Sequence, residues 1–263
     1  MEPAILTRIL EAAELGPQET VVEVGPGLGL LTRELAPRCR RVLAVELDAA
    51  LAAALPEMVG LPANLTVLQA DILSLSPDEL SSEPYKVVAN LPFYIASQVI
   101  RLFLEASHKP QRMVVMVQKE VAQRMLAKPG EMSILGVAIQ LYSRPRLVTY
   151  VPARCFYPPP KVESAVVCLE VYDRPALELA DVNAFFRVVR AGFSAPRKQL
   201  RNTLSQGLGL RPEIVAAVLE SVGVSPQRRP QTLALEEWGA VCGAVVPHLS
   251  EVADVDATSA SQD

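Results

Sequence analysis

The sequence has little of what metal centres, secreted proteins and membrane proteins need. Its two histidines lie far apart, and its four cysteines show no C-x-x-C spacing: His108, His248, Cys39, Cys155, Cys168 and Cys242. This pattern argues against a metal site and indicates reduced, mostly buried thiols. No apolar run reaches the roughly 18 residues of a membrane span, and no basic-then-apolar signal opens the chain. We therefore expect a cytoplasmic protein that does not enter the membrane.

The chain also lacks an excess of positive charge, which is unusual for a protein that binds nucleic acid. Its net charge is −4 over 263 residues. The segment 251–263 carries four carboxylates and no basic residue (Glu251, Asp254, Asp256 and Asp263), so the rest of the chain is neutral overall. This polar, acidic tail is predicted to be disordered.

Basic residues gather instead in two groups. The first group lies within residues 183–230 and contains Arg187, Arg190, Arg197, Lys198, Arg201, Arg211, Arg228 and Arg229. The second group contains Lys109, Arg112, Lys119, Arg124 and Lys128. Such groups can neutralise phosphates and give salt-dependent RNA binding. They can equally be solvated helix faces, with Ser194 capping a helix and Pro196 in its first turn. The two interpretations can hold together.

A glycine turn follows the first predicted strand. Residues 20–24 form a β-branched run, followed by Gly25-Pro26-Gly27-Leu28-Gly29 and a helical pattern,. Glycines here would let the backbone approach a nucleotide-like ligand. Thr32 stands where a dinucleotide fingerprint has its third glycine. Glu23 would repel a pyrophosphate but could face the ammonium or sulfonium of S-adenosylmethionine. The alternative is a tight turn without a ligand.

Two more acids follow the next strands. Glu46 ends the run 41–45, and Asp71 follows the run 64–69. Glu46 could accept both ribose hydroxyls, Asp71 could accept from an adenine amino group, and the Ile72 amide could serve a ring nitrogen. Singly, each acid is more often a solvated residue at a strand end. Together with Glu23 and Asn90, however, they end four successive strands at one sheet edge.

The segment Asn90-Leu91-Pro92-Phe93 follows the apolar run 87–89 and supplies what amine methylation needs. The Asn90 side-chain oxygen and the Leu91 carbonyl can both accept from an exocyclic amine, and thereby orient its lone pair. Pro92 fixes φ and stiffens the loop, and Phe93 offers a face on which a base can stack. The alternative is a proline turn with a core phenylalanine.

With these motifs in place, the sequence resembles the rRNA adenine N6,N6-dimethyltransferases of small-subunit assembly, the KsgA type. The resemblance covers residues 1–248, and the Phe-x-Pro-x-Pro-Lys-Val-x-Ser stretch from Phe156 is its most specific part. The matching segments are Glu23–Gly29, Ala44–Glu46, Asp71, Asn90–Phe93, Met116–Arg124, Val151–Val167, Arg197–Leu204 and Arg229–Leu233.

The resemblance implies a fold and a reaction. The fold would be the α/β, Rossmann-like sheet of a class I S-adenosylmethionine methyltransferase, with a small C-terminal all-helical domain. Residues 1–175 would form the S-adenosylmethionine-binding catalytic domain and residues 176–250 a helical RNA-binding domain. The reaction would dimethylate N6 of two adjacent adenines near the 3′ end of 16S rRNA, in the 30S subunit or its precursor. We expect a monomer that needs no metal.

The resemblance also implies roles for individual residues. Glu46 would hold the ribose, Asp71 the cofactor adenine, and Asn90 with Leu91 the target amine, while the target base lies between Phe93 and Phe156. The residues expected to bind the cofactor are Glu23, Gly25, Gly27, Gly29, Glu46, Leu47, Asp71, Ile72 and Asn90. The residues expected to act in catalysis are Asn90, Leu91, Pro92, Phe93 and Phe156. The residues expected to contact RNA are Arg187, Arg190, Arg197, Lys198, Arg201, Lys119 and Arg124.

Two other functions fit the same motifs. One is a 23S rRNA adenine methylase of the macrolide-resistance type, and the other is a non-catalytic RNA-binding assembly factor on the same scaffold. The chain also departs from the family at Phe93, where tyrosine is more usual. The family's Gln-x-Phe-Leu segment, which helps to cover the cofactor, would precede Met1-Glu2-Pro3. We therefore expect a late start or a shorter cover.

Hydrophobic patterns predict the order of elements. A helix is expected over residues 1–15, followed by strands that alternate with helical stretches. The last two strands would form a hairpin at the sheet edge, and beyond Pro175 the chain reads as helical. The expected strands are 20–24, 41–45, 64–69, 86–89, 112–117, 146–151 and 164–171, and the later helices are 181–193, 197–206, 211–222 and 235–248.

Overall fold

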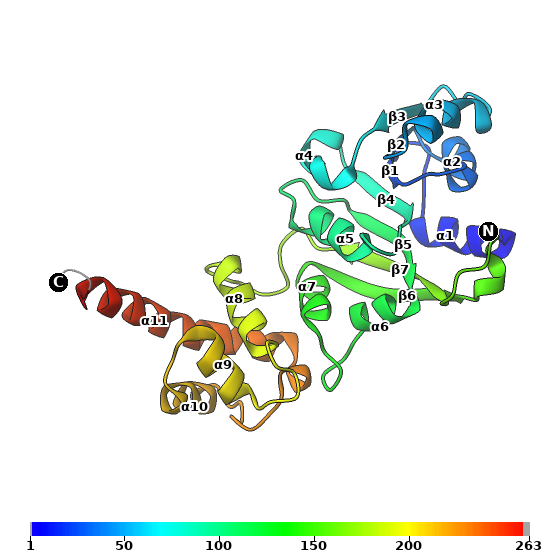
Figure 1. Cartoon of the computed structure of the whole chain (residues 1–263). Helices are drawn as coiled ribbons and strands as arrows, with labels where there is room; N and C mark the ends of the chain where they lie inside the picture. The colour runs from blue at the N-terminus through cyan, green and yellow to red at the C-terminus, as the bar shows by residue number, and fades with distance from the viewer. Residues whose placement is uncertain (1, 260–263) are drawn as a thin grey trace. The chain divides into compact units, whose positions relative to one another are not determined.

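The computed structural model describes residues 2–259, with side chains described for residues 2–249. The chain divides into two compact units (Figure 1). The first contains residues 1–126 and 142–175, and the second contains residues 127–141 and 176–263. Of the segment 251–263, which is predicted to be a disordered tail, residues 251–259 are helical and form the end of the helix Leu235–Ser259. Residues 260–263 and the side chains from residue 250 onward lie outside the described residues, and disorder there stays a prediction.

The first unit is built on a seven-stranded mixed sheet, and the predicted α/β fold is confirmed. The strand order is β3-β2-β1-β4-β5-β7-β6; β1 to β5 run parallel, and β7 is antiparallel to both β5 and β6. The predicted hairpin at the sheet edge is therefore β6–β7. The strands are β1 (Thr20–Val24), β2 (Arg41–Glu46), β3 (Leu65–Gln69), β4 (Tyr85–Asn90), β5 (Arg112–Gln118), β6 (Ser143–Val151) and β7 (Ser164–Val171).

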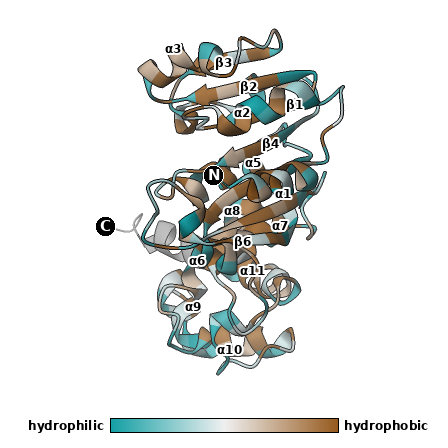
Figure 2. Ribbon diagram, turned by 90° about the vertical axis from the view of Figure 1, so that its right-hand side faces the viewer, coloured by the Kyte–Doolittle hydropathy of each residue, from teal (hydrophilic) through white to brown (hydrophobic). Residues whose placement is uncertain are grey.

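Continuous apolar runs form the central strands because both faces of the sheet are covered by helices. Figure 2 shows the hydrophobic residues concentrated on these strands. Val88 of β4 belongs to a core cluster with residues of α1 and α2 on one face. Tyr85 lies three residues earlier on the same strand, so it points to the other face. There its ring lies 6.3 Å from that of Phe103 of α5.

Six helices of the first unit flank this sheet. α1 is anchored at its end because the Lys86 ammonium donates to the Glu14 carbonyl (2.7 Å) and Arg112 pairs with the Glu14 carboxylate (2.7 Å). No helix among the described residues is long and apolar enough to span a bilayer. The six helices are α1 (Pro3–Ala13), α2 (Leu30–Leu35), α3 (Ala49–Met58), α4 (Pro77–Leu80), α5 (Ala96–Glu105) and α6 (Lys119–Met125).

The second unit is helical and is centred on Trp238, which is fully buried and stacks on Phe193 with the ring centroids 5.4 Å apart. Gly192 permits this contact, because a β-carbon there would collide with the indole ring. The helices are α7 (Ile134–Tyr142), most of which belongs here, α8 (Val182–Gly192), α9 (Leu200–Leu208), α10 (Pro212–Ser221) and α11 (Leu235–Ser259).

One predicted helix start is wrong. Ser194 does not cap a helix: its hydroxyl donates to the Ala191 carbonyl (2.8 Å), at the end of α8. α9 begins at Leu200, so Pro196 lies in the turn between the two helices. The local serine-proline pattern was therefore outweighed by the hydrogen bond that closes the preceding helix.

Candidate active site

A cavity of about 490 Å³ lies where β1, β2, β3 and β4 end. Ligand sites of open α/β sheets are found at this edge, because the carboxyl ends of parallel strands meet there. Each of the four strands, or the loop that follows it, contributes wall residues. They are Val24, Gly25, Val45, Glu46, Leu47, Asp48, Ala70, Asp71, Ile72, Leu73, Pro92, Tyr94 and Ile95.

Glu46 is a buried carboxylate of this cavity that is held by two backbone amides. It is the last residue of β2 and only 7% exposed. One carboxylate oxygen accepts from the Gly27 amide (3.0 Å), and the other accepts from the Asp48 amide (3.0 Å). Each oxygen keeps a further lone pair. Glu46 is therefore fixed in orientation and can still accept hydrogen bonds from ligand hydroxyls.

Asp71 faces the same cavity from the end of β3. Its Oδ1 accepts from the Leu73 amide (2.9 Å), which fixes the side chain, while the residue stays exposed. Leu47 and Ile72, the residues after the two acids, add apolar surface; Leu47 is 57% exposed and Ile72 is 4% exposed. Two acceptors and apolar side chains in one cavity match a nucleoside, which has donor groups at its edges and flat apolar faces.

The three glycines of the turn serve three different purposes. All have positive φ, at which β-carbon-bearing residues are strained,. Gly25 lines the cavity beside Pro92, and Gly27 gives its amide to Glu46. Gly29 allows helices to pack, because a β-carbon there would collide with Val59 and Leu55. Of the three predicted ligand contacts, the structure places only Gly25 in the cavity wall.

Glu23 and Thr32 form a buried pair beneath the glycine turn. The Thr32 hydroxyl donates to Glu23 Oε2 at 2.6 Å, and neither residue is more than 1% exposed. Burial raises the pKa of the Glu23 carboxyl to about 8,. Glu23 is thus not in the cavity wall but one layer behind it. Its partner Thr32 stands at the position where a dinucleotide fingerprint has its third glycine,.

The loop after β4 borders the cavity on its remaining side. Asn90 is the last residue of β4 and is exposed. Leu91 is buried, and its amide donates to the Met116 carbonyl (3.1 Å), which locks the loop onto β5. Pro92 lines the cavity, and Phe93 is half-buried. Asn90, Leu91 and Phe93 therefore lie next to the cavity without forming its wall.

Phe156, the predicted second stacking residue, lies in the connection between β6 and β7. Its ring is half-buried and packs against the core cluster that includes Val151 and Cys155. It is not among the residues that line the cavity. In this conformation one side of the ring is occupied by the core.

The predicted RNA-contacting residues fall into two classes. Arg187, Arg190, Arg197 and Lys198 are exposed and form no ion pair with a described residue, and the half-buried Arg201 guanidinium donates to the Asn202 side-chain oxygen (3.4 Å). In contrast, Lys119 pairs with Glu163 (2.7 Å), and Arg124 pairs with Glu120. Arg228, which lies within the basic group of residues 183–230 in the sequence, forms a bidentate ion pair with Glu237. It holds the start of α11 rather than adding free charge.

Sequence reasoning missed several wall residues. Tyr94 and Ile95 directly follow the Asn90–Phe93 segment, and Tyr94 is 77% exposed. Asp48, two residues after Glu46, caps α3 by accepting from the Ala50 amide (2.8 Å). Their nearness in sequence to the recognised motifs was the available signal.

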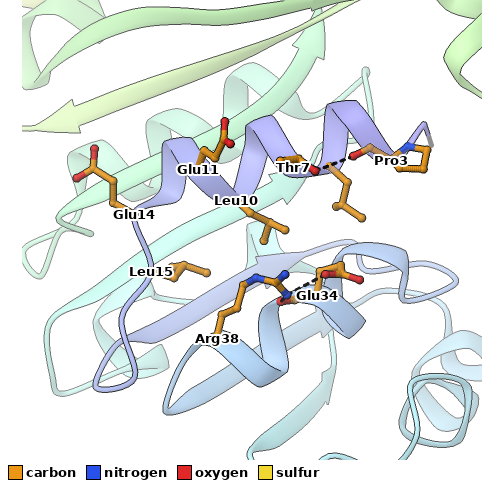
Figure 3. Close-up of a pocket in the computed structure, with 9 residues that line it drawn as sticks. Pro3, Thr7, Leu10, Glu11, Glu14, Leu15, Glu34 and Arg38 are labelled. Carbon is orange, nitrogen blue, oxygen red and sulfur yellow. Dashed lines mark hydrogen bonds and ion pairs between the residues drawn. The ribbon is translucent and has the colours of Figure 1, made fainter.

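A larger hollow, of about 610 Å³, lies between α1 and α2 (Figure 3). Half-buried leucines line it, and its charges are largely neutralised, since Glu34 pairs with Arg38 (2.8 Å) and Glu14 with Arg112 (2.7 Å). No strand end contributes to it. Within the described residues no group of three or more His, Cys, Asp or Glu could hold a metal ion. The cavity at the strand ends is therefore the candidate site.

Comparisons with known proteins show which family this chain resembles. The family model for ribosomal RNA adenine dimethylase matches residues 1–240. The ribosomal RNA small subunit methyltransferase A of Dehalococcoides mccartyi is 48% identical over 240 residues, which cover 90% of this chain and 82% of that protein. The protein of the same name from Bacillus cytotoxicus is 38% identical over 255 residues, covering 93% and 87%.

Solved structures share the architecture. The 23S rRNA methyltransferase ErmE has a TM-score of 0.74 at 31% identity, over 93% of this chain and 98% of that one. A dimethyladenosine transferase from Plasmodium falciparum has a TM-score of 0.78 at 25% identity, over 91% and 94%.

Proposed function

We propose, because this chain belongs to the ribosomal RNA adenine dimethylase family, that it dimethylates N6 of two adjacent adenines near the 3′ end of 16S rRNA. The class I methyltransferase fold predicted from the sequence is confirmed by the seven-stranded sheet and its structural neighbours. The gathering of Glu46, Asp71 and the Asn90–Phe93 loop at one sheet edge carries the proposal.

The cavity fits S-adenosylmethionine. Glu46 is oriented by two backbone amides and would accept from the ribose hydroxyls, and Asp71 would accept from the adenine amine. Leu47 and Ile72 would cover the faces of the adenine ring. When bound, this cofactor supplies a methyl group that is already activated by its sulfonium. Glu23, buried behind the turn, would support the loop rather than contact the ligand directly.

Asn90 would hold the target amine. Its side-chain oxygen and the Leu91 carbonyl can accept the two N–H donors, so that the nitrogen lone pair points away from them. An exocyclic amine is a weak nucleophile, and no strong base is needed if orientation and exclusion of water carry the rate. A neutral amide also leaves room for an amine that carries one methyl group, as a second transfer requires. Phe93 would stack on the base.

The small subunit is favoured over the 23S alternative. The chain is 48% identical to a small-subunit enzyme but 31% identical to ErmE. ErmE nevertheless matches the fold over 93% of this chain, so the fold alone does not separate the two functions. The non-catalytic alternative would not require Glu46, Asp71 and Asn90 to be preserved together. We infer that residues 1–175 carry the chemistry and that the exposed basic residues of α8 and of the turn before α9 contact rRNA phosphates.

The proposal is tested by incubating the chain with labelled S-adenosylmethionine and small subunits that lack the modification, followed by nucleoside analysis. We expect label in N6,N6-dimethyladenosine. Cofactor binding measured by calorimetry without RNA separates the alternatives, because a pure RNA-binding factor need not bind S-adenosylmethionine. Subunit binding without cofactor binding or methyl transfer would establish the non-catalytic function instead.

A further inference from the structure

Tyr157 is the most exposed large side chain of apolar character described in the chain, at 99%. It lies in the connection of residues 152–163 between β6 and β7. The backbone at Phe156 is extended, with φ −116° and ψ 156°. Because successive side chains of an extended segment point to opposite sides, Phe156 packs on the core while Tyr157 points into solvent. On this connection, Tyr157 is the ring with both faces available.

The connection holds this ring on a stiff support. Three prolines, Pro158, Pro159 and Pro160, follow it directly, and each fixes φ and lacks an amide donor,. A ring held in this way loses little conformational freedom when a ligand stacks on it. The Tyr157 hydroxyl forms no hydrogen bond with a described residue.

The connection itself carries two cations that are unpaired among the described residues, while the nearby Glu2 carboxylate accepts from the Cys155 thiol (2.9 Å). Arg154 and Lys161 flank Tyr157, both are exposed, and neither forms an ion pair with a described residue. The one carboxylate of the connection, Glu163, is paired with Lys119. Lys119 also lies 5.3 Å from the ring centre of Tyr150, a second partly exposed tyrosine on β6. Aromatic faces among unpaired cations are typical of surfaces that bind single-stranded nucleic acid.

The sheet register places this connection beside the catalytic loop. Asn90 of β4 pairs with Met116 of β5, and Met116 pairs with Val166 of β7. Val166 is two residues from Ser164, where the connection joins β7. Neighbouring strands are about 4.8 Å apart. The connection therefore leaves the sheet two strands away from Asn90, at the same edge.

From this juxtaposition we infer that Tyr157 is a stacking platform for an rRNA nucleotide next to the adenine held by Asn90. Arg154 and Lys161 contact the phosphates on either side of that nucleotide. The inference rests on the proposed function, which supplies the RNA and the position of the target base. Tyr157 is a positioning residue, since it fixes the strand rather than touching the reacting nitrogen.

The test measures binding of unmodified small subunits to Tyr157→Ala, Tyr157→Phe and wild type, with Tyr172→Ala as the control. Tyr172 follows the other end of β7 and is 36% exposed. Loss of one base–aromatic stack should weaken binding about tenfold in Tyr157→Ala. Tyr157→Phe keeps the ring and should bind like wild type, as should Tyr172→Ala. Calorimetric affinity for S-adenosylmethionine should be unchanged in all four proteins.

Binding decides the role of Tyr157 whether or not methyl transfer is observed. If Tyr157→Ala binds the subunit as tightly as wild type, the stacking role is wrong. If Tyr157→Phe is as weak as Tyr157→Ala, the ring face is not what the RNA recognises, and the inference fails in that way too. Absence of dimethyladenosine with the wild-type chain would instead overturn the proposed function.

Discussion

The Thr32 hydroxyl donates a hydrogen bond of 2.6 Å to the buried Glu23 carboxyl, directly beneath the glycine turn. The pair joins the first turn of α2 to β1, so it fixes how the helix leaves the strand. A dinucleotide-binding turn would have a glycine at this helix position. Here the larger threonine satisfies an acid instead, and the glycine turn is shaped around that contact.

The pair makes stability depend on pH. Burial raises the pKa of Glu23 from 4.5 in the unfolded chain to about 8 in the folded one. A raised carboxyl pKa means that the folded state holds its proton more tightly, so its contribution is complete below about pH 4.5 and is lost as pH rises through about 8. We expect the free energy of unfolding to fall between these values, by an amount of order a few kcal/mol.

Glu23→Gln removes the ionisation and keeps an oxygen that can accept from Thr32. The midpoint temperature of thermal unfolding, measured without cofactor from pH 5 to pH 9, should therefore change less with pH in this variant than in wild type. Glu11→Gln, a substitution on the exposed side of α1, should keep the wild-type profile. A Glu23→Gln profile parallel to wild type would show that Glu23 does not titrate in this range.

Asn90→Ala should abolish methyl transfer and leave subunit binding nearly unchanged. The substitution removes the side-chain acceptor for the amine, while the exposed position at the end of β4 lets the fold tolerate it. Gln98→Ala, which removes an exposed amide from α5, is the matched control and should retain activity. Single-turnover methylation would show this, and a normal rate in Asn90→Ala would remove its proposed role.

Arg197→Glu combined with Lys198→Glu should weaken subunit binding and flatten its dependence on salt. Both residues are exposed and unpaired among the described residues, so they are free to neutralise phosphates. Each lost phosphate contact lowers the slope of log K against log salt by about 0.7 to 0.9. Arg8→Glu, a charge reversal at an exposed position of α1, introduces half of that change in net charge away from the proposed surface and should keep the wild-type slope. Identical slopes in wild type and the double variant would place the RNA surface elsewhere.

Arg228→Met should destabilise the protein without altering its RNA contacts. The guanidinium binds both Glu237 oxygens and the Thr232 carbonyl (2.6 Å). Loss of these charged hydrogen bonds should lower the free energy of unfolding by about 1–3 kcal/mol. Arg229→Met, at the exposed neighbouring position, should leave it unchanged. Urea denaturation of the two variants makes the comparison, and equal midpoints would mean that the ion pair has no net effect.

Much of the fold could be predicted because its signals are local. Most of the strands follow apolar, β-branched runs, which are buried in β1, β2, β4, β5 and β7, and all seven strand ends were found within three residues, including Ser143–Val151 at the edge. The parallel order of the first strands then placed Glu46 and Asp71 at one cavity. The position of each acid at the end of a predicted strand was enough to predict that Glu46 and Asp71 lie at the same edge of the sheet.

The remaining features depend on contacts between distant residues. Residue 29 must be glycine because a β-carbon there would collide with Leu55 of α3 and with Val59, which follows α3. The buried Glu23 carboxyl is satisfied by the Thr32 hydroxyl. Arg228 looks like part of a basic cluster until its partner Glu237, nine residues later, is seen in space. The exposure of Tyr157 against the half-buried Phe156 likewise follows from tertiary packing, which no pattern in the sequence reveals.

The most direct test of the central claim is a competition between substrates. Unmodified small and large ribosomal subunits are mixed with this chain and labelled S-adenosylmethionine, and the modified nucleotides in each RNA are mapped. The account predicts dimethyladenosine at two adjacent adenines near the 3′ end of 16S rRNA, with no label in 23S rRNA. Label confined to 23S rRNA would contradict it.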